Sequence, residues 1–418
     1  MRALQLLSLR AFLGIAAVAW TMGLAAHAQN LHTLYTFPGG ASGANPTGTL
    51  VRDSSGNLYG VTSYGGIVNS QCADGCGTVF EVSPSTSGWT ESVIYSFTGA
   101  NGDGYFPWGL AADAAGNLYG VTEWGGSSNS SVNCVPLCGT VFKLSPGASG
   151  WSYQVIHSFQ GGSHDGAFPA TNIVLDKQGN IYGTTSAGGI GVPACYGAGC
   201  GTVWELSPTA SGAWKEKIIH NFLGMGYGAF PHGLTMDVNG NIYGATWYGG
   251  NAQQGTVYKL SPTKNGWIGG VIYRMPGGTD GFTPYGVVAV DSKGNVYGST
   301  WGLSLQQYGV VFELTPTKSG WTEQVLYSFA ATQSQLIPTY GVTVDAAGNV
   351  YGTNNSSVFE LSDASGSWNF TTLANFGGVN EGSDPAGAVI FDAAGNMYGT
   401  TWAGQGTAKE GTVFEITP

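Results

Sequence analysis

The chain has 418 residues, of which 70 are glycine, 12% are aromatic and only 9% are charged. Its 42% of hydrophobic residues is enough for a large buried core, so the glycine content does not indicate disorder. The formal net charge is −11, and the 13 Lys and Arg residues are spread over the whole length. Nucleic acid and anionic membrane surfaces are therefore not expected as partners, because both bind clustered basic residues.

Residues 1–28 have the features of a secretory signal peptide. Arg2 and Arg10 are followed by an apolar run over residues 11–24, and Ala26 and Ala28 are small residues suited to cleavage. We expect cleavage after Ala28 and a mature chain of residues 29–418 without a membrane span. We expect a secreted protein that is extracellular, associated with the cell surface or periplasmic. A membrane anchor is the alternative, but the apolar run is short for a bilayer.

After this segment the pattern Asp-x-x-Gly-Asn-apolar-Tyr-Gly recurs seven times, at intervals of 47 to 63 residues. A tandem repeat of this length indicates one supersecondary unit that is copied along the chain. Within each copy, the Asp and the Gly predict a tight turn in which Asp accepts backbone hydrogen bonds and Gly takes a positive φ. The residues assigned to these turns are Asp53, Asp113, Asp176, Asp237, Asp291, Asp345 and Asp392.

Each copy contains four β-type segments separated by turn signals; in the second copy they are residues 109–113, 117–122, 139–144 and 151–159. Short antiparallel sheets that are apolar on both faces and repeat seven times predict a seven-bladed β-propeller, with four strands in each blade. No change in composition separates the copies, so we expect a single all-β domain over residues 29–418. The glycine after each Tyr is expected to let neighbouring blades approach near the centre.

The two ends of the chain complement each other. The sequence ends after a third-strand pattern at residues 411–416, and a fourth-strand pattern occurs at residues 34–37. We therefore expect the N-terminal strand to complete the last blade, which closes the ring and leaves no free sheet edge. A solenoid is the alternative, but a solenoid needs capping repeats and has no use for a circularly permuted strand.

The six cysteines form three close pairs, which are Cys72 and Cys76, Cys134 and Cys138, and Cys195 and Cys200. In an oxidising compartment such pairs are expected to form local disulfides, each holding one loop in shape. Metal binding is the alternative. A zinc site usually needs two close pairs that converge, and these pairs lie in different copies of the repeat.

The motifs Gly-Asn-Leu-Tyr-Gly-Val-Thr, Gly-Thr-Val-Phe-Glu-Leu and Ile-Tyr-Ser-Phe recur in a fixed order. In this order they resemble the GloVer tandem-repeat family of secreted bacterial proteins, over essentially the whole mature chain. The resemblance implies a β-propeller-like, extracytoplasmic protein of the choice-of-anchor type, and it supplies no catalytic residues. Because the sequence ends at Pro418 without a sorting tail, covalent attachment to the cell surface is not expected.

The loops between second and third strands should share one face of the ring with the crossings between copies, and such loop-rich faces usually carry function. The aromatic candidates there are Trp108, His232 and Tyr285, which follow a proline and break the repeat, and Trp124, Trp247 and Trp301 in the loops. The acidic candidates are Asp103, Asp165 and Asp280, with Glu123 and Glu381 as further acids for acid–base chemistry. Packing between blades is the alternative role for the aromatic residues.

Aromatic rings with interspersed carboxylates can stack on sugar rings and accept hydrogen bonds from hydroxyl groups. The leading hypothesis is a secreted, non-enzymatic binding or surface-interaction module, whose partner is an extracellular polysaccharide or another cell-surface component. One alternative is a propeller glycoside hydrolase or polysaccharide lyase that uses the loop-face acids and His232. Another is an envelope scaffold without a small ligand. No cofactor, metal site or catalytic residue is assigned, because no motif for one is present.

Overall fold

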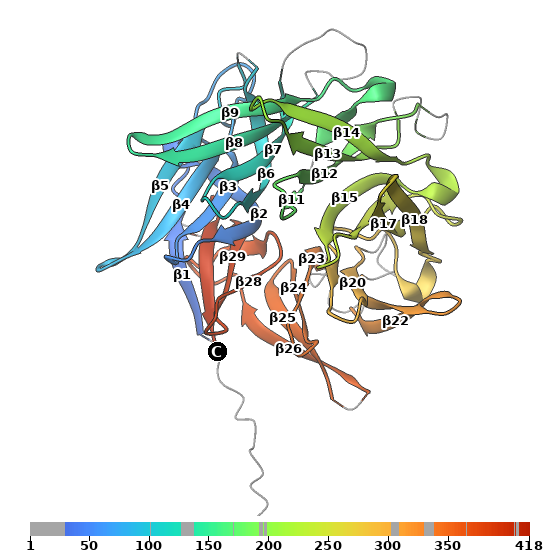
Figure 1. Ribbon diagram of the computed structural model, residues 1–418. Coiled ribbons are helices and arrows are strands. Elements are labelled where there is room, and N and C mark those ends of the chain that lie inside the picture. The colour runs from blue at the N-terminus through green and yellow to red at the C-terminus, as the bar shows by residue number, and fades with distance from the viewer. Residues whose placement is uncertain are drawn as a thin grey trace, which may run out of the picture.

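In the computed structural model, seven antiparallel sheets are arranged as blades around a central axis (Figure 1). The structure describes residues 30–418 except 101, 127–137, 170, 192–194, 196–198, 302–308, 330–337, 365, 405 and 407–408. No α-helix occurs among these residues. The prediction of a seven-bladed β-propeller is therefore confirmed. The predicted signal peptide, residues 1–28, lies outside the described residues.

In blades 1 to 6 the strands follow one another in chain order outward from the axis, whereas blade 7 has the order β27, β29, β30 and β1. In blades 3 and 7 the first strand is split in two. Blades 1 and 2 consist of β2 (Ala44–Arg52), β3 (Leu58–Tyr64), β4 (Thr78–Ser85), β5 (Gly88–Ser96), β6 (Gly104–Ala112), β7 (Leu118–Gly125), β8 (Thr140–Gly147) and β9 (Gly150–Ser158). Blades 3 and 4 consist of β10 (Gly166–Pro169), β11 (Val174–Leu175), β12 (Ile181–Gly188), β13 (Thr202–Pro208), β14 (Trp214–Asn221), β15 (Ala229–Met236), β16 (Ile242–Tyr248), β17 (Thr256–Thr263) and β18 (Gly266–Arg274).

Blades 5 and 6 consist of β19 (Ala289–Val290), β20 (Val296–Ser299), β21 (Val310–Thr317), β22 (Gly320–Ser328), β23 (Pro338–Val344), β24 (Val350–Asn354), β25 (Ser357–Asp363) and β26 (Trp368–Asn375). Blade 7 consists of β27 (Ser383–Pro385), β28 (Ile390–Phe391), β29 (Met397–Ala403), β30 (Thr412–Thr417) and β1 (Asn30–Thr36). In the described parts of the crossings between blades lie four short 3-10 segments: η1 (Gly40–Ser42), η2 (Gly162–His164), η4 (Met225–Tyr227) and η5 (Gly278–Asp280).

The N-terminal strand closes the ring as expected. β1 pairs antiparallel with β30, and its register runs from Asn30 opposite Thr417 to Thr36 opposite Thr412. In Figure 1 the blue β1 accordingly lies beside the red strands of the last sheet. The first and last described strands of the chain thus share one blade, in which β1 covers β30 and itself forms the outer edge.

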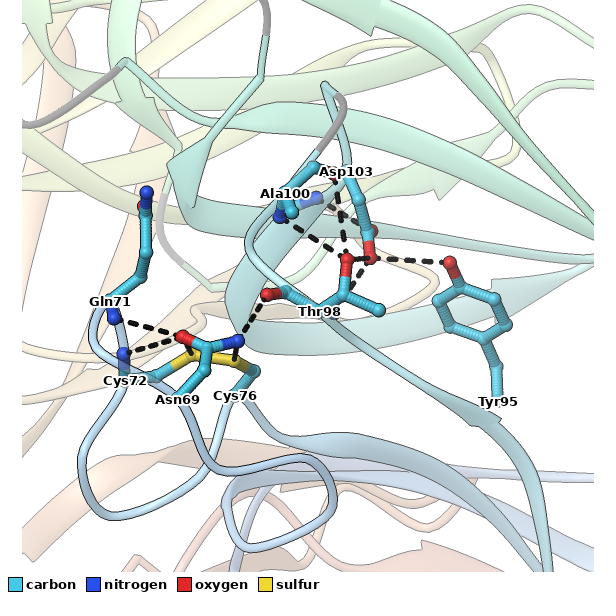
Figure 2. Close-up of a disulfide and its surroundings, with 9 residues drawn as sticks. Asn69, Gln71, Cys72, Cys76, Tyr95, Thr98, Ala100 and Asp103 are labelled. Atoms are coloured by element: carbon cyan, nitrogen blue, oxygen red, sulfur yellow. Dashed lines mark hydrogen bonds between the residues drawn. A yellow bond between two sulfur atoms is a disulfide. The ribbon is translucent and has the colours of Figure 1, made fainter.

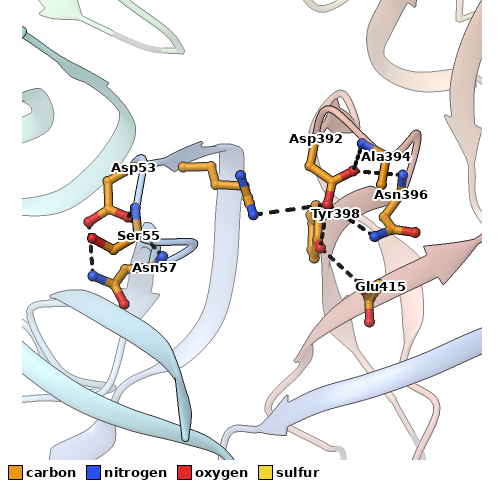
Figure 3. Close-up of polar contacts among 9 residues, drawn as sticks. Asp53, Ser55, Asn57, Asp392, Ala394, Asn396, Tyr398 and Glu415 are labelled. Atoms are coloured by element: carbon orange, nitrogen blue, oxygen red, sulfur yellow. Dashed lines mark hydrogen bonds and ion pairs between the residues drawn. The ribbon is translucent and has the colours of Figure 1, made fainter.

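The repeated aspartates form the predicted turns. The Oδ1 atom of Asp53 accepts hydrogen bonds from the backbone N–H groups of Ser55 (2.8 Å) and Asn57 (2.9 Å). Its Oδ2 atom accepts hydrogen bonds from the Asn57 amide (2.8 Å) and the Tyr59 hydroxyl (3.1 Å). Figure 3 shows this turn beside the matching turn at Asp392. The same contacts recur in the other copies, so each turn holds the hydroxyl of the tyrosine that follows it.

The glycine after each of these tyrosines has a different role from the one expected. A Cβ atom on Gly60 would overlap the ring of Phe80, which lies opposite it on β4 and is completely buried. The expectation that these glycines bring neighbouring blades together is therefore wrong, since each makes room for an aromatic ring of its own blade. Neighbouring blades approach instead through first-strand glycines: a Cβ atom on Gly48 would lie 3.0 Å from the Cα atom of Gly109 in the next blade.

Two of the predicted disulfides are present, Cys72–Cys76 and Cys195–Cys200. Cys134, the expected partner of Cys138, lies outside the described residues. Figure 2 shows the first disulfide in the loop between β3 and β4, where the Asn69 amide donates a hydrogen bond to the carbonyl oxygen of Thr98 (2.7 Å). The disulfide loop is thereby connected to the crossing that enters blade 2.

Candidate functional site

Two kinds of connection lie on the same side of the ring, namely the loops from second to third strands and the crossings between blades. We call this side the loop face, and we call the opposite side, which carries the tight turns, the hairpin face. The predicted ligand-binding residues come from the crossings, the loops and the adjoining strands of the loop face. The structure gathers some of them near the axis and places others near the outer strands.

Five rings from blades 4, 5 and 6 form one aromatic cluster on the loop face. Tyr285 lies at its centre, and its ring centroid is 4.9 Å from that of His232, 6.0 Å from Trp247, 5.8 Å from Trp301 and 6.2 Å from Tyr340. We call these five residues the His232 cluster. Its most exposed member, Trp301, is 41% exposed, so the cluster reaches the protein surface.

Strand register explains why this cluster forms. His232 on β15 lies opposite Ala245 on β16, and Trp247 is two residues beyond Ala245. Residues two apart on a strand point to the same side of a sheet, so the His232 and Trp247 rings project from the same face of blade 4. Tyr285 and Trp301 come from the same two places in blade 5, and they meet the blade 4 rings at the boundary between the blades.

Two polar atoms of the cluster are buried without a hydrogen-bond partner among the described residues. They are Nδ1 of His232 and Nε1 of Trp247. Unpaired buried polar groups are uncommon, and a bound ligand or an ordered water is a usual reason for one. Burial lowers the pKa of His232 to about 4, so its imidazole is neutral near pH 7.

A carboxylate lies on the other side of the axis. Nε1 of Trp108 donates a hydrogen bond of 3.0 Å to Oε2 of Glu123, and both residues belong to blade 2. Burial raises the pKa of Glu123, and the Trp108 hydrogen bond opposes this shift without cancelling it. The Trp108 ring contacts Phe106, which in turn contacts Tyr64 of blade 1.

Glu123 and the His232 cluster interact electrostatically. Burial raises the pKa of Tyr285, and the charge of Glu123 raises it further. Blades 2 and 5 are not neighbours, since blades 3 and 4 separate them on one side and three blades separate them on the other. The interaction therefore crosses the centre of the ring, with the carboxylate on one side and the aromatic cluster on the other.

The predicted acids lie elsewhere. The Asp103 carboxylate is 8% exposed and accepts backbone hydrogen bonds from Thr98 and Gly104, both of 2.7 Å (Figure 2). Asp165 is bound in the same way by the next crossing, through the N–H groups of Gln160 and Gly166. Asp280 is the last residue of η5. The pKa of Tyr273, on the outer strand β18, is raised mainly by burial and by Glu323, and the charge of Asp280 contributes to the same shift. Asp103 and Asp165 therefore hold crossings, and Asp280 lies near the outer strand β18.

Trp124 also lies outside the His232 cluster. It follows Glu123 on β7, and its ring centroid is 4.9 Å from that of Phe168 in blade 3. Alignment on the threonine that ends each second-strand motif shows the reason. Glu123, rather than Trp124, occupies the position of Trp247 and Trp301, and adjacent residues of a strand point to opposite sides.

Two members of this site were not among the sequence-based ligand candidates. Tyr340 stands one position further along its strand than Tyr285, so a search for residues directly after proline does not find it. Glu123 was predicted only as a member of an acid pair. A copy-by-copy alignment of second strands would have identified it, because Glu123 is the one carboxylate at a position that is tryptophan in three other copies, at Trp247, Trp301 and Trp402.

Clefts between neighbouring blades open on the hairpin face. One of about 420 Å³ lies between blades 3 and 4, lined by Tyr182 and Trp267, and one of about 480 Å³ lies between blades 4 and 5. Their aspartates already accept the turn hydrogen bonds, so few unused carboxylate lone pairs remain there. Within the described part of the chain, no three His, Cys, Asp or Glu side chains gather in a way that could hold a metal ion.

The fold and the site define a seven-bladed propeller with an aromatic, acid-containing loop face. The chain belongs to the Gloeobacter/Verrucomicrobia repeat family, whose model matches residues 18–194, 66–268, 191–358 and 270–418. This confirms the resemblance inferred from the repeated motifs. No curated protein is significantly similar to the chain. The described residues contain no helix that is long and apolar enough to cross a membrane.

Solved structures share the fold at low sequence identity. The extracellular domain of a one-component system from B. thetaiotaomicron matches with a TM-score of 0.53 and 10% identity, over 92% of this chain and 40% of that one. The extracellular domain of a hybrid two-component system from the same organism matches with a TM-score of 0.51 and 15% identity, over 93% and 41%. The PQQ-bound aldose sugar dehydrogenase of Streptomyces coelicolor gives 0.46 and 12%, over 74% and 93%. The similarities to the two extracellular domains show the propeller fold alone.

Proposed function

We propose that the protein is a secreted, non-enzymatic carbohydrate-binding propeller whose ligand lies on the loop face, against the His232 cluster. The observation that carries the proposal is the meeting of five rings at positions where the repeats differ from one another. Residues that serve packing alone would recur in every blade. At the His232 position, blades 1 and 7 instead have Thr47 and Ala386.

The chemistry of the cluster suits a sugar. Indole and phenol rings stack on the C–H faces of pyranoses, and the ring of Trp301 is partly exposed for such a contact. The unpaired Nε1–H of Trp247 can donate to a hydroxyl oxygen, and the Glu123 carboxylate can accept from a hydroxyl. Sites of this type combine apolar surface with a few polar groups that fix the orientation of the ligand.

Two observations support secretion. The first 28 residues have the composition of a signal peptide, and two short-range disulfides are of the kind that persists in oxidising compartments. The proposal therefore places the protein outside the cytoplasm, where a polysaccharide would be accessible to it.

Affinity electrophoresis on gels that contain a panel of neutral, basic and acidic polysaccharides tests the proposal. We expect retention on at least one of them, and a loss of about 2 kcal/mol, or roughly 30-fold in affinity, for Trp301→Ala and for Trp247→Ala. Tyr227→Ala is the matched control, because Tyr227 is 61% exposed and lies in η4, outside the His232 cluster. Equal retention of all three variants would exclude the His232 cluster as the binding site.

The same polysaccharides test the enzymatic alternative, which one observation favours. Glu123 is a partly buried carboxyl group with a raised pKa, as a general acid requires. If reducing ends or unsaturated products appear with the wild type and disappear with Glu123→Gln, the protein is a hydrolase or a lyase and the binding module is rejected. Absence of both retention and turnover would leave the envelope scaffold.

A further inference from the structure

The loop face and the hairpin face differ in their charged residues. Among the described residues, the acids in the crossings, loops and adjoining strand ends of the loop face are Asp74, Asp103, Glu123, Asp165, Asp280, Glu381, Asp384 and Glu410. The Lys and Arg residues on this side are Lys409 and Arg274, and Nε of Arg274 donates a hydrogen bond to the carbonyl oxygen of Gly226. The other basic residues of the described chain are Arg52, Lys143, Lys177, Lys215, Lys217, Lys259, Lys264, Lys293 and Lys318, which lie within strands or on the hairpin face.

Glu123 is an acid of this face whose charge reaches the His232 cluster, at Tyr285, and Asp384 acts on the same cluster at Tyr340. The Glu123 carboxylate accepts a hydrogen bond from the neutral indole of Trp108. The two ion pairs found among the described residues, Arg52 with Asp392 and His157 with Asp165, do not include it. Partial burial of a carboxylate without a cation is costly, and the raised pKa of Glu123 is the consequence. A cation bound at the axis would remove this cost.

The rings opposite Glu123 also favour a cation. The faces of tryptophan and tyrosine rings carry negative electrostatic potential, and a cation near such a face gains roughly 0.5–2 kcal/mol. Trp247, Tyr285 and Trp301 present rings within 6.2 Å of one another by their centroids. His232 does not oppose a cation, because burial keeps its imidazole neutral, and its unpaired Nδ1 adds a polar atom beneath the rings.

We propose that the loop face selects saccharides that carry a protonated amine, such as oligomers of glucosamine, with the ammonium group held between Glu123 and the rings of the His232 cluster. The inference rests on the proposed carbohydrate-binding function and specifies its ligand class. The sugar ring supplies the stacking surface, and the ammonium group supplies the positive charge that pairs with the Glu123 carboxylate.

Isothermal titration calorimetry with three β-1,4-linked tetrasaccharides tests this selection. The three are oligomers of glucosamine, of N-acetylglucosamine and of glucose, which differ at one substituent of each ring. At a pH where the amine is protonated and Glu123 is ionised, we expect the glucosamine oligomer to bind about tenfold more tightly than the other two, which corresponds to ~1.4 kcal/mol. Added salt should reduce this preference and leave the affinity for the glucose oligomer unchanged.

Glu123→Gln keeps the size of the side chain and its acceptor oxygen but removes the charge. It should abolish most of the tenfold preference while the glucose oligomer binds as it does to the wild type. The matched control is Glu410→Gln, which removes one charge from the loop face at a side chain that lies against Gly39. A thermal melt of each variant confirms that it is folded.

Each other outcome overturns the proposal in a distinguishable way. Equal affinity for the three oligomers refutes selection for the amine and leaves carbohydrate binding intact. A preference that survives Glu123→Gln refutes the assigned partner of the ammonium group. Choline that binds as tightly as the glucosamine oligomer shows a general cation site rather than a saccharide site. If no oligomer and no polysaccharide binds, the proposed carbohydrate-binding function is refuted as well.

Discussion

The backbone N–H of Phe106 donates a 3.1 Å hydrogen bond to the carbonyl oxygen of Cys76, and this bond joins blade 2 to blade 1. The same bond joins Phe230 to Cys200, at 2.9 Å, between blades 4 and 3. In both cases the acceptor belongs to a cysteine in a disulfide. The disulfides therefore fix the orientation of carbonyl groups that hold the next blade in place.

Removal of one disulfide should loosen a blade boundary more than it destabilises the whole ring. For Cys72→Ser combined with Cys76→Ser, the closed loop is short, so we expect a loss of at most about 2 kcal/mol in the free energy of unfolding. Hydrogen exchange at the Phe106 amide should nevertheless accelerate by at least about tenfold relative to the wild type.

The boundary between blades 4 and 5 provides an internal control. There the backbone N–H of Thr283 donates a 2.8 Å hydrogen bond to the carbonyl oxygen of Gln254, in a loop without a cysteine. Its exchange rate should not change in the double serine variant. If the Phe106 amide also remains protected in that variant, the disulfide does not position the carbonyl group.

The fold was predictable because its information is local and repeated. Each turn is specified by an aspartate whose carboxylate accepts hydrogen bonds from the backbone N–H groups of the turn, and by a glycine that tolerates positive φ, as at Asp53 and Gly56. The start of the first strands was less predictable. β6 begins at Gly104, five residues before the predicted segment at 109. The sequence pattern misses this start because the strand is irregular there: Phe106 has a positive φ of 59°, and a register shift follows Trp108.

The site was predictable only in part. His232 and Tyr285 were found because they break the repeat, and the structure brings their rings together. Trp108 was found by the same rule, but it lies beside Glu123. Which copies face each other across the axis is set by ring closure, a long-range property. The interaction between Glu123 and Tyr285 therefore has no signature in sequence spacing.

A methyl group added at Gly60 should destabilise blade 1. The Cβ atom of Gly60→Ala would overlap the ring of Phe80 and lie 2.9 Å from Cδ2 of Leu50, and both side chains are buried. We expect a loss of about 1–3 kcal/mol, measured by urea unfolding. Gly226→Ala is the control, because the nearest atom to its Cβ would be 3.9 Å away, and it should be almost neutral.

The Gly60→Ala variant also tests the origin of the effect. Phe80→Leu removes the atoms that the new methyl group meets. The double variant should then lose less stability than the sum of the two single variants, because the two sites share one contact. Strict additivity would show that Gly60 is required for a reason other than the Phe80 ring.

Deletion of residues 30–37 should prevent formation of a stable monomer. Without β1, the whole length of β30 from Thr412 to Thr417 becomes an open edge, which promotes pairing with other chains. We expect lost cooperativity in thermal melts and oligomers in size-exclusion chromatography. A circular permutant that carries residues 30–37 after Pro418, joined by a short flexible linker, should recover the wild-type melt. A stable monomeric deletion variant would contradict strand closure as the source of stability.

The stability of the propeller should have a maximum in mildly acidic solution, because two sets of carboxyl groups titrate in opposite directions. Burial alone would raise the pKa of Asp392, but hydrogen bonds from Asn396, Ala394 and Tyr398 outweigh it and lower the pKa below 3.8 (Figure 3). Asp53 and Asp113 have lowered pKa values for the same reason. Below about pH 4 the unfolded chain binds protons before these turns do, so stability is lost as the pH falls through their folded pKa values.

Glu216 on β14 acts in the opposite direction. Burial and the nearby charge of Asp165 raise its pKa to about 7, against a smaller opposing effect of His157. Between pH 7 and its ordinary value of 4.5, the folded chain binds a proton that the unfolded chain does not. Stability therefore rises as the pH falls through this window, and Glu91, Glu123 and Glu323 shift in the same direction.

Urea unfolding midpoints measured from about pH 8 to about pH 3 test both effects, with an expected maximum near pH 5. Glu216→Gln should flatten the rise between pH 7 and 4.5, because it removes the group whose pKa is about 7, and should leave the acid limb unchanged. Asp392→Asn should instead reduce the loss below about pH 4, since it removes one of the carboxylates that the unfolded chain protonates first. A midpoint that increases steadily up to pH 8 in the wild type would show that the buried glutamates do not control stability in this range.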